Sequence, residues 1–167
     1  MASGDTLLIF TPLSNEPPAS NFATLDTRNG HPCLDFDDST DESAIFTGVL
    51  PRHYSGGGIT VYLHIAFTSA TSGNADIEVS FERIGDEQQG LGSDGFASAK
   101  AVNVPAPGTA GLATIDALSF SNGAEIDSIA AGEAFRIKVT RDADDATNDT
   151  ASGDAELIAI ELRETPA

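Results

Sequence analysis

Hydrophobic and polar residues alternate along most of the chain, and the clearest example is the stretch 56–67. Three glycines lead into a run in which every second side chain is large and apolar. Because side chains in a β-strand point alternately to its two faces, this pattern predicts a strand with one strongly apolar face. No other stretch concentrates as much apolar surface, so we expect a central strand. Its inward-facing side chains are Ile59, Val61, Leu63, Ile65 and Phe67.

The same alternation predicts further strands on both sides of this one. Two of them, at 22–27 and 32–37, flank Asn29-Gly30, a strong hairpin signal because both residues tolerate positive φ. The strand at 155–162 carries apolar residues on both faces, which indicates a strand covered on both sides. The other strands are expected at 7–10, 43–50, 75–84, 112–120 and 133–141. The side chains expected to be buried together are Val61, Leu63, Ile65, Ile77, Val79, Phe81, Phe135 and Ile137.

The segments between the strands are short or irregular, and none predicts a long helix. Asp94 could cap a short helix at 96–100, one helical turn is expected within 124–130, and 102–111 is expected to be irregular. About eight strands with frequent turns predict an all-β fold, an antiparallel jelly-roll-like β-sandwich. An immunoglobulin-like sandwich is the alternative, but the chain has no Trp for the Cys–Trp–Cys pattern of that fold.

The amino-terminal stretch 1–21 is expected to be an extended N-terminal arm with a short strand, preceding a β-sandwich domain at 22–167. Three prolines in the eight residues after the apolar run 7–10 rule out regular structure there. The run could be an edge strand of the same domain, or the arm could dock on a neighbouring subunit. In the second case the partner-binding side chains would be Leu7, Leu8, Ile9, Phe10 and Leu13.

The net charge of the chain limits the kinds of partner that it can bind. The 167 residues include 26 acidic and 8 basic side chains, a net charge of −18, which disfavours nucleic acid and anionic membranes. The acidity favours either solubility alone or docking on a basic protein surface. No signal peptide or membrane-spanning run is visible, so we expect a soluble protein made in a reducing cytoplasm. The lone Cys33 is expected to be a small buried residue.

Two acidic stretches are candidates for chemistry. In the first, Asp35 and Asp37 share a strand face, and paired carboxylates can act as acid and base; Asp38, Asp41 and Glu42 follow. No substrate groove is apparent, so a solvated loop is the preferred interpretation. The second, 142–149, offers the oxygen ligands that Ca²⁺ requires, but it lacks the glycine and glutamate of an EF-hand. We expect an acidic loop that does not require calcium.

Other chemical signatures are missing from the sequence. His31, His53 and His64 have no zinc-site spacing, and there is no nucleophile elbow, phosphate loop or dinucleotide fingerprint. The sequence therefore predicts no catalytic residue, no cofactor and no metal site, and the protein is expected not to be an enzyme.

Three parts of the chain resemble the small β-sandwich virion proteins of tailed bacteriophages. They are 23–32 with 34–38, 56–67 with 80–84, and 131–142 with 153–156. The resemblance implies a capsid cement (decoration) protein that forms a homotrimer, binds the major capsid protein and is located in the virion after synthesis in the host cytoplasm. A tail or baseplate component would have the same pattern.

Two other classes remain open. A carbohydrate-binding module or receptor-binding fibre head would also be a small β-sandwich, but it should expose an aromatic platform. Only Tyr54 and Tyr62 could supply one, since the chain has no Trp. A hydrolase is the third class.

Overall fold

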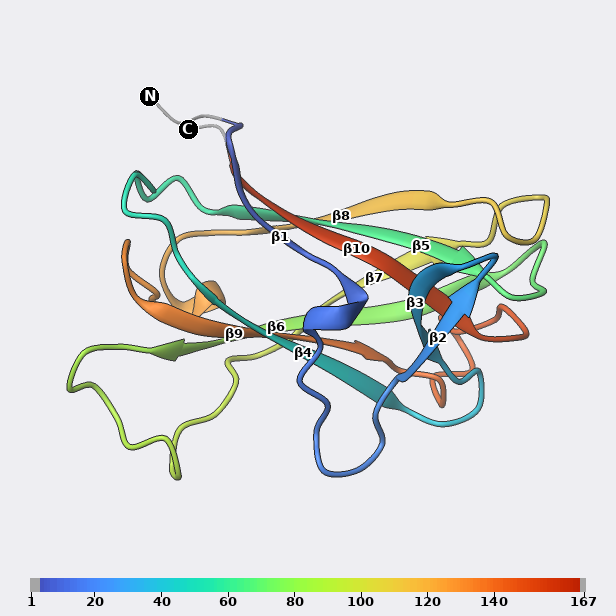
Figure 1. The fold of residues 1–167 in the computed structure, drawn as a ribbon, viewed down its shortest axis with the longest axis horizontal. Helices are drawn as coiled ribbons and strands as arrows, with labels where there is room; N and C mark the ends of the chain where they lie inside the picture. The colour runs from blue at the N-terminus through green and yellow to red at the C-terminus, as the bar shows by residue number, and fades with distance from the viewer. Residues whose placement is uncertain (1–3, 166–167) are drawn as a thin grey trace.

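Two antiparallel β-sheets pack face to face in the computed structural model, which describes residues 4–165 (Figure 1). The all-β sandwich predicted from the alternation is confirmed. Sheet A has the order β2-β3-β10-β5-β8, with β1 also paired to β10, and sheet B has the order β4-β9-β6-β7. Sheet A contains β1 (Thr6–Phe10), β2 (Thr24–Arg28), β3 (His31–Phe36), β5 (Ile59–Phe67), β8 (Thr114–Phe120) and β10 (Ala155–Glu164). Sheet B contains β4 (Glu42–Val49), β6 (Asn74–Ile84), β7 (Lys100–Pro105) and β9 (Ala134–Arg141).

The core lies between the two sheets, on the faces that the alternation predicts. The eight side chains expected to be buried together are all at most 1 % exposed, so the predicted face of each strand is confirmed. Aromatic rings cross between the sheets, and the ring of Phe81 in β6 meets that of Phe120 in β8 edge-on at 5.0 Å. β5, with β10 on one side and β8 on the other, is a central strand as expected.

The predicted hairpin is also present, with its turn where the sequence places it. Asn29 and Gly30 have φ angles of 48° and 79° and join β2 to β3 in antiparallel register. Both residues occupy the left-handed region that a two-residue hairpin turn of this kind needs. The hairpin sets Arg28 directly opposite His31.

A β-bulge in β10 explains the apolar residues that the sequence shows on both faces. The pairing with β5 slips between Leu157 and Ala159, so Ile158 is an extra residue and the alternation changes phase there. Leu157, Ile160 and Leu162 consequently all point into the core and are at most 2 % exposed. The interpretation of a strand covered on both sides was therefore wrong. On one edge, β10 pairs with β3 before the bulge and with β1 after it.

The alanine-rich segment before β7 is extended, and the helix expected at 96–100 is not formed. The backbone N–H of Ala97 donates to Phe81 O (2.8 Å), and the ring of Phe96 lies over the outer face of sheet B. There Lys138 Nζ and Arg136 Cζ lie 4.8 Å and 5.1 Å from the ring centroid. From Lys100 the chain pairs with β6, so part of the stretch expected to be irregular is a strand. The helical turn expected within 124–130 is present as a 3₁₀ turn, η2 (Ala124–Ile126).

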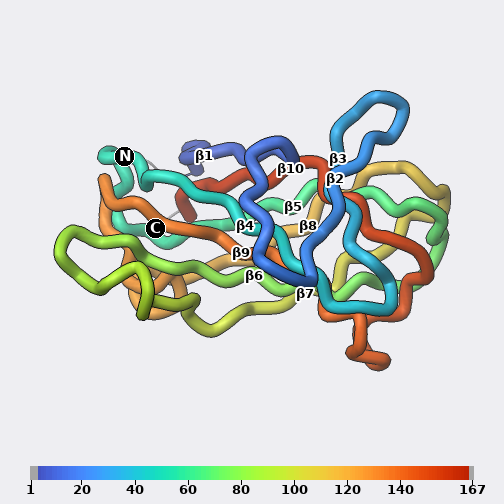
Figure 2. The backbone as a smooth tube through the Cα atoms, turned by 60° about the horizontal axis from the view of Figure 1, so that its bottom comes forward, coloured from blue at the N-terminus to red at the C-terminus, as the bar shows by residue number. Residues whose placement is uncertain are grey.

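The amino-terminal segment lies against its own domain within the described residues. β1 pairs with the end of β10, as Figure 2 shows, and the short 3₁₀ turn η1 (Pro12–Ser14) follows it. Leu7 and Phe10 are buried in the core, and the Phe10 ring packs where Gly48 of β4 has no side chain. The edge-strand alternative thus describes residues 6–10, and an arm extending away from the domain is not seen in 4–21. The burial of Leu7 and Phe10 removes both side chains from the surface.

One arginine is completely buried, which the sequence did not suggest. Arg141, the last residue of β9, points inward and is 0 % exposed. Its guanidinium makes two hydrogen bonds of 2.8 Å to the carboxylate of Asp149. The remaining guanidinium donors reach the carbonyl oxygens of Phe36, Ala151 and Gly153 at 2.8–3.2 Å. All five N–H groups are therefore used, and the arginine ties the 142–154 loop to the end of β3.

Neither 3₁₀ turn in the described part of the chain is long and apolar enough to cross a membrane, and that part has no other helix.

Candidate ligand groove on the outer face of sheet A

Two adjoining pockets lie on the outer face of sheet A, where β3 and β10 meet. They have volumes of about 430 Å³ and about 330 Å³. His31, Pro32 and Ile158 line both, so the two pockets form one feature, which we call the outer groove. The first pocket is also lined by Arg28, Asn29, Cys33, Ala66, Gly111 and Glu156, and the second by Thr11, Pro12 and Leu13.

The alternation of the strands explains why these side chains face outward. Leu34 and Phe36 fill the core, so Cys33 and Asp35, which alternate with them along the strand, point to the opposite face of β3. The pairing of β10 with β3 sets Glu156 beside Cys33 on that face. The bulge keeps Ile158 out of the core, and it becomes the apolar floor shared by both pockets.

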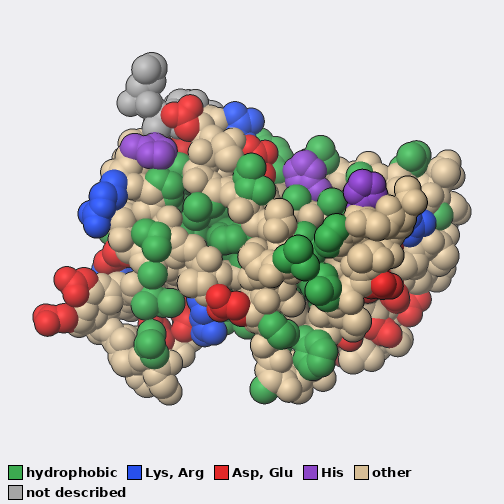
Figure 3. Space-filling model, in the orientation of Figure 1, with side chains coloured by type: hydrophobic (Ala, Val, Ile, Leu, Met, Phe, Trp, Pro, Cys, Tyr) green, Lys and Arg blue, Asp and Glu red, His purple; other side chains and the backbone are tan. Residues whose placement is uncertain are grey.

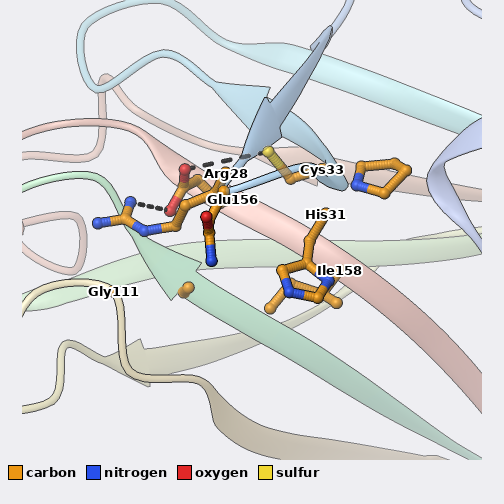
Figure 4. Close-up of a pocket in the computed structure, with 9 residues that line it drawn as sticks. Arg28, His31, Cys33, Gly111, Glu156 and Ile158 are labelled. Carbon is orange, nitrogen blue, oxygen red and sulfur yellow. Dashed lines mark hydrogen bonds and ion pairs between the residues drawn. The ribbon is translucent and has the colours of Figure 1, made fainter.

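An ion pair forms the polar end of the groove, as Figure 4 shows. Arg28 Nη1 lies 2.6 Å from Glu156 Oε2, and the Glu156 side chain is only 6 % exposed. Gly111 approaches the guanidinium so closely that an added Cβ would lie 2.7 Å from Arg28 Nη2. Arg28 is thus held between a buried carboxylate and the 106–113 loop, and it neutralises the charge at the groove floor.

The thiol of Cys33 lies beneath this pair. Its Sγ donates to Asp35 Oδ1 (3.4 Å). It also lies 3.9 Å from Glu156 Oε1, the contact that Figure 4 marks. Burial, followed by the hydrogen bond and charge of Asp35, raises the pKa of the Cys33 thiol to about 12. Burial likewise raises the pKa of Asp35. The thiol is therefore protonated at neutral pH and is not a nucleophile, and the expectation of a small buried cysteine is confirmed.

The acidic stretch after Cys33 is used for hydrogen bonds within and between loops. Asp35 lies on β3, whereas Asp37 lies beyond its end, where its Oδ1 accepts from the backbone N–H of Ser39 (2.7 Å). The hydrogen bond from the Ser39 hydroxyl, followed by the one from its backbone N–H, lowers the pKa of Asp37. Asp38 accepts from the N–H of Gly153, and Asp41 Oδ1 accepts from the N–H of Ala143 (2.9 Å). The catalytic pair considered from the sequence is not brought together.

The aromatic platform expected of a sugar-binding protein is not supplied by the two tyrosines. Tyr54 is 8 % exposed, and its hydroxyl accepts from Gly58 N (3.0 Å) and contacts Asn122 Oδ1 (3.3 Å). Tyr62 is half-buried on the outer face of β5, outside the set of residues that line the groove. The rings that do line it belong to His31 and Pro32, and only the imidazole of His31 is planar.

The face drawn in Figure 3 carries histidine side chains with hydrophobic side chains gathered beside them. Sequence reasoning did not single out Arg28, His31 and Glu156. The Asn-Gly signal predicts that Arg28 and His31 face each other across a hairpin, but Glu156 joins them only through the β3–β10 pairing. That pairing depends on strand order, which one sequence does not show.

Three groups of side chains within residues 4–165 bring three potential metal ligands within 4.8 Å of one another. The group in the groove is Cys33, Asp35 and Glu156. Its Glu156 carboxylate already pairs with Arg28 and its thiol donates to Asp35, so a metal ion would have to displace both contacts. The other two groups consist of aspartates alone.

Comparison with known proteins identifies structures of similar fold but does not assign the chain to a family. No protein family matches the sequence. No curated protein matches it either. The xylan-binding domain CBM22-1 of Paenibacillus barcinonensis Xyn10C is similar in structure, with a TM-score of 0.50 and 12% identity over 100% of this chain and 99% of that domain.

A second similar structure is that of PfGH50B, with a TM-score of 0.56 and 12% identity. This chain is covered completely but spans only 24% of PfGH50B. At such identities the similarity shows a shared β-sandwich fold.

Proposed function

We propose that the protein is a non-catalytic binding module whose outer groove binds a neutral carbohydrate chain. The observation that carries the proposal is the groove itself, two adjoining pockets that share the apolar side chain of Ile158, with an ion pair in the first pocket. Sugars present hydroxyl groups beside apolar C–H faces, and sites of this kind combine apolar walls with a few fixed polar groups. Arg28, Asn29 and His31 supply such polar groups beside Ile158.

The charges around the groove favour a neutral ligand. Arg28 is already neutralised by Glu156, and Asp26 and Asp35 lie on the same face of the β2–β3 hairpin. An anionic polysaccharide would meet these carboxylates and the net charge of −18. The similarity to a xylan-binding domain agrees with a neutral glycan but does not identify the sugar.

The arrangement of carboxylates supports a binding role without hydrolysis. A glycosidase needs two carboxyl groups that flank the bond to be cleaved. Glu156 lines the groove but Asp35 does not, and the Cys33 thiol hydrogen-bonds between the two. Ligand atoms of these two carboxylates and of the Cys33 thiol lie within 4.8 Å of one another, so the two carboxylates do not flank an open substrate position.

Replacing His31 with alanine is expected to weaken binding of a neutral polysaccharide about tenfold, a factor that corresponds to about 1.4 kcal/mol. His31 lines both pockets, so its loss removes a flat contact surface from the whole groove. Affinity electrophoresis against a panel of neutral polysaccharides that includes xylan, followed by calorimetry on the best ligand, measures the change.

His53→Ala is the matched control, because His53 is another exposed histidine and does not line the groove. It should bind as the unchanged protein does. The proposal fails if no glycan of the panel binds, or if H31A and H53A have the same affinity as the original chain.

A capsid cement protein remains a second proposal, favoured by the exposed apolar side chains near the amino terminus. Ile9 is 63% exposed and Leu13 71% exposed, and Phe22 and Leu25 are also exposed. Two of the five predicted partner-binding residues, Ile9 and Leu13, are thus well exposed, and Leu8 is partly buried. A contact with a capsid protein would remove these side chains from water.

Light scattering and virion analysis test this second function. A homotrimer at micromolar concentration and density of the protein on the capsid exterior are the expected results. In a trimer held through the amino-terminal segment, Ile9→Asp should lower the apparent mass to that of a monomer. A monomeric original chain, or a virion without the protein, would count against the cement function.

A further inference from the structure

Five aspartates gather at one end of the sandwich, although they come from three separate segments. Asp41 precedes β4, Asp76 lies in β6, and the other three follow β9. Carboxylate oxygens of Asp76, Asp142 and Asp145 lie within 4.8 Å of one another, and so do those of Asp41, Asp142 and Asp144. Asp142 belongs to both groups. We call these five residues the aspartate cluster.

Asp76 has an unusual position for a carboxylate. The residue is 4% exposed, and its Oδ1 is buried without a hydrogen-bond partner among residues 4–165. Its backbone is held on both sides, because Asp142 N donates to Asp76 O (3.0 Å) and Asp76 N donates to Asp149 Oδ2 (3.0 Å). A buried, unpaired carboxylate oxygen is costly to keep in a fold. Here it belongs to a side chain directed toward two further carboxylates.

No basic side chain in the described part of the chain forms an ion pair with the cluster. Arg141 is adjacent in sequence, but it points into the core and its charge is matched by Asp149. The negative charges of the cluster are therefore uncompensated by the protein, and a bound cation would relieve their repulsion.

We propose that the aspartate cluster binds one calcium ion through Asp76, Asp142 and Asp145. Calcium takes six to eight oxygen ligands in a flexible geometry, and carboxylates can supply one or two oxygens each, with water completing the shell. The cluster offers only carboxylate oxygens, which favours calcium over zinc or copper. Asp41 and Asp144 form the second group with Asp142 and add negative charge near the ion.

The structure supplies what the acidic loop alone lacks. Within 142–149 the sequence has no EF-hand frame, and no calcium requirement was expected from it. The buried third ligand comes from β6, which pairs with β9 so that Ile77 lies opposite Arg141 and Asp76 comes beside Asp142. The ligand set is discontinuous in sequence and becomes complete only through this pairing.

Calcium titration of the chelator-treated full chain tests the proposal. Calorimetry should show one ion per chain. A Ca²⁺ concentration about one hundred times the Kd should raise the Tm by roughly 5–10 °C, because the ion binds only the folded chain. Excess chelator should reverse the shift. Magnesium, which demands a stricter octahedral geometry, should raise the Tm less at the same concentration.

Asp76→Asn and Asp145→Asn are the variants, with Asp86→Asn as the matched control. Asp86 is an exposed aspartate after β6 and is not part of the cluster. D76N and D145N should each bind calcium at least about tenfold more weakly, which corresponds to about 1.4 kcal/mol. D76N without calcium should melt no lower than the original chain, since the buried unpaired charge is gone. D86N should behave as the original chain in both measurements.

Two outcomes would overturn the proposal. One is the absence of binding heat and of any Tm shift in the original chain at about 10 mM Ca²⁺, above the weakest range of extracellular calcium modules. The other is unchanged calcium affinity in the variants. If D76N does not fold, D145N decides, because Asp145 lies in a partly exposed loop position.

Discussion

Replacing Arg141 with methionine is expected to lower the free energy of unfolding by about 3–5 kcal/mol, the range for removal of one partner from a buried ion pair. The guanidinium and the Asp149 carboxylate are 0% and 2% exposed, so the remaining carboxylate would stay buried without its partner. Three backbone carbonyls, those of Phe36, Ala151 and Gly153, would also lose their donor. Urea titration of R141M against the original chain measures the loss.

A double variant separates the cost of leaving the Asp149 carboxylate buried and unpaired from the cost of losing the hydrogen bonds to the three carbonyls. R141M combined with Asp149→Asn should recover part of the loss, because the amide carries no charge to leave buried. Arg52→Met, at an exposed position, is the control and should stay within about 0.5 kcal/mol of the original chain. A double variant as unstable as the sum of both single variants would show that the ion pair contributes little and that the carbonyl contacts dominate.

Leu63→Ala is expected to cost about 2–5 kcal/mol, since it removes a fully buried side chain and leaves a cavity. Leu63 is 0% exposed at the middle of β5, with Ile160 of β10 and Asp116 of β8 as its cross-strand neighbours. Both sheets are close-packed around it, so the site can collapse only partly. Denaturant titration measures the change in the free energy of unfolding, as a shift of the unfolding midpoint with an unchanged dependence on denaturant concentration.

Leu91→Ala provides the comparison for this core substitution. Leu91 is 74% exposed after β6, and its truncation should change the stability by less than about 0.5 kcal/mol. Equal costs for L63A and L91A would mean that the apolar face of β5 is not the centre of the fold.

The strands and the core could be predicted from the sequence because they depend on local alternation. The faces of β5, β6 and β9 follow directly from side chains at every second position. The helix expected at 96–100 was wrong because a contact distant in sequence decides its structure. Phe96 lies over Arg136 and Lys138, and this packing holds the segment extended despite its alanines.

The outer groove and the buried arginine could not be predicted because they depend on strand order and on one extra residue. Ile158 breaks the alternation of β10, and the sequence alone does not distinguish such a bulge from a strand covered on both faces. Arg141 lies two residues after Val139, in the alternation that points Phe135, Ile137 and Val139 into the core. The sequence pattern could therefore have predicted that Arg141 points inward. Its acceptors, however, come from loops whose positions the sequence does not give.

The pairing of β1 with β10 has a mechanical consequence. Gly4 N donates to Glu164 O (2.9 Å), so both ends of the described chain leave the domain side by side (Figure 1). Tension applied through these two ends acts across the ladder and opens its hydrogen bonds one after another, starting at the Gly4–Glu164 bond and continuing to the Thr6–Arg163 pair. β1 would peel away first and pull Leu7 and Phe10 out of the core, so a module tethered at both ends yields to force at this edge before the rest of the sandwich opens.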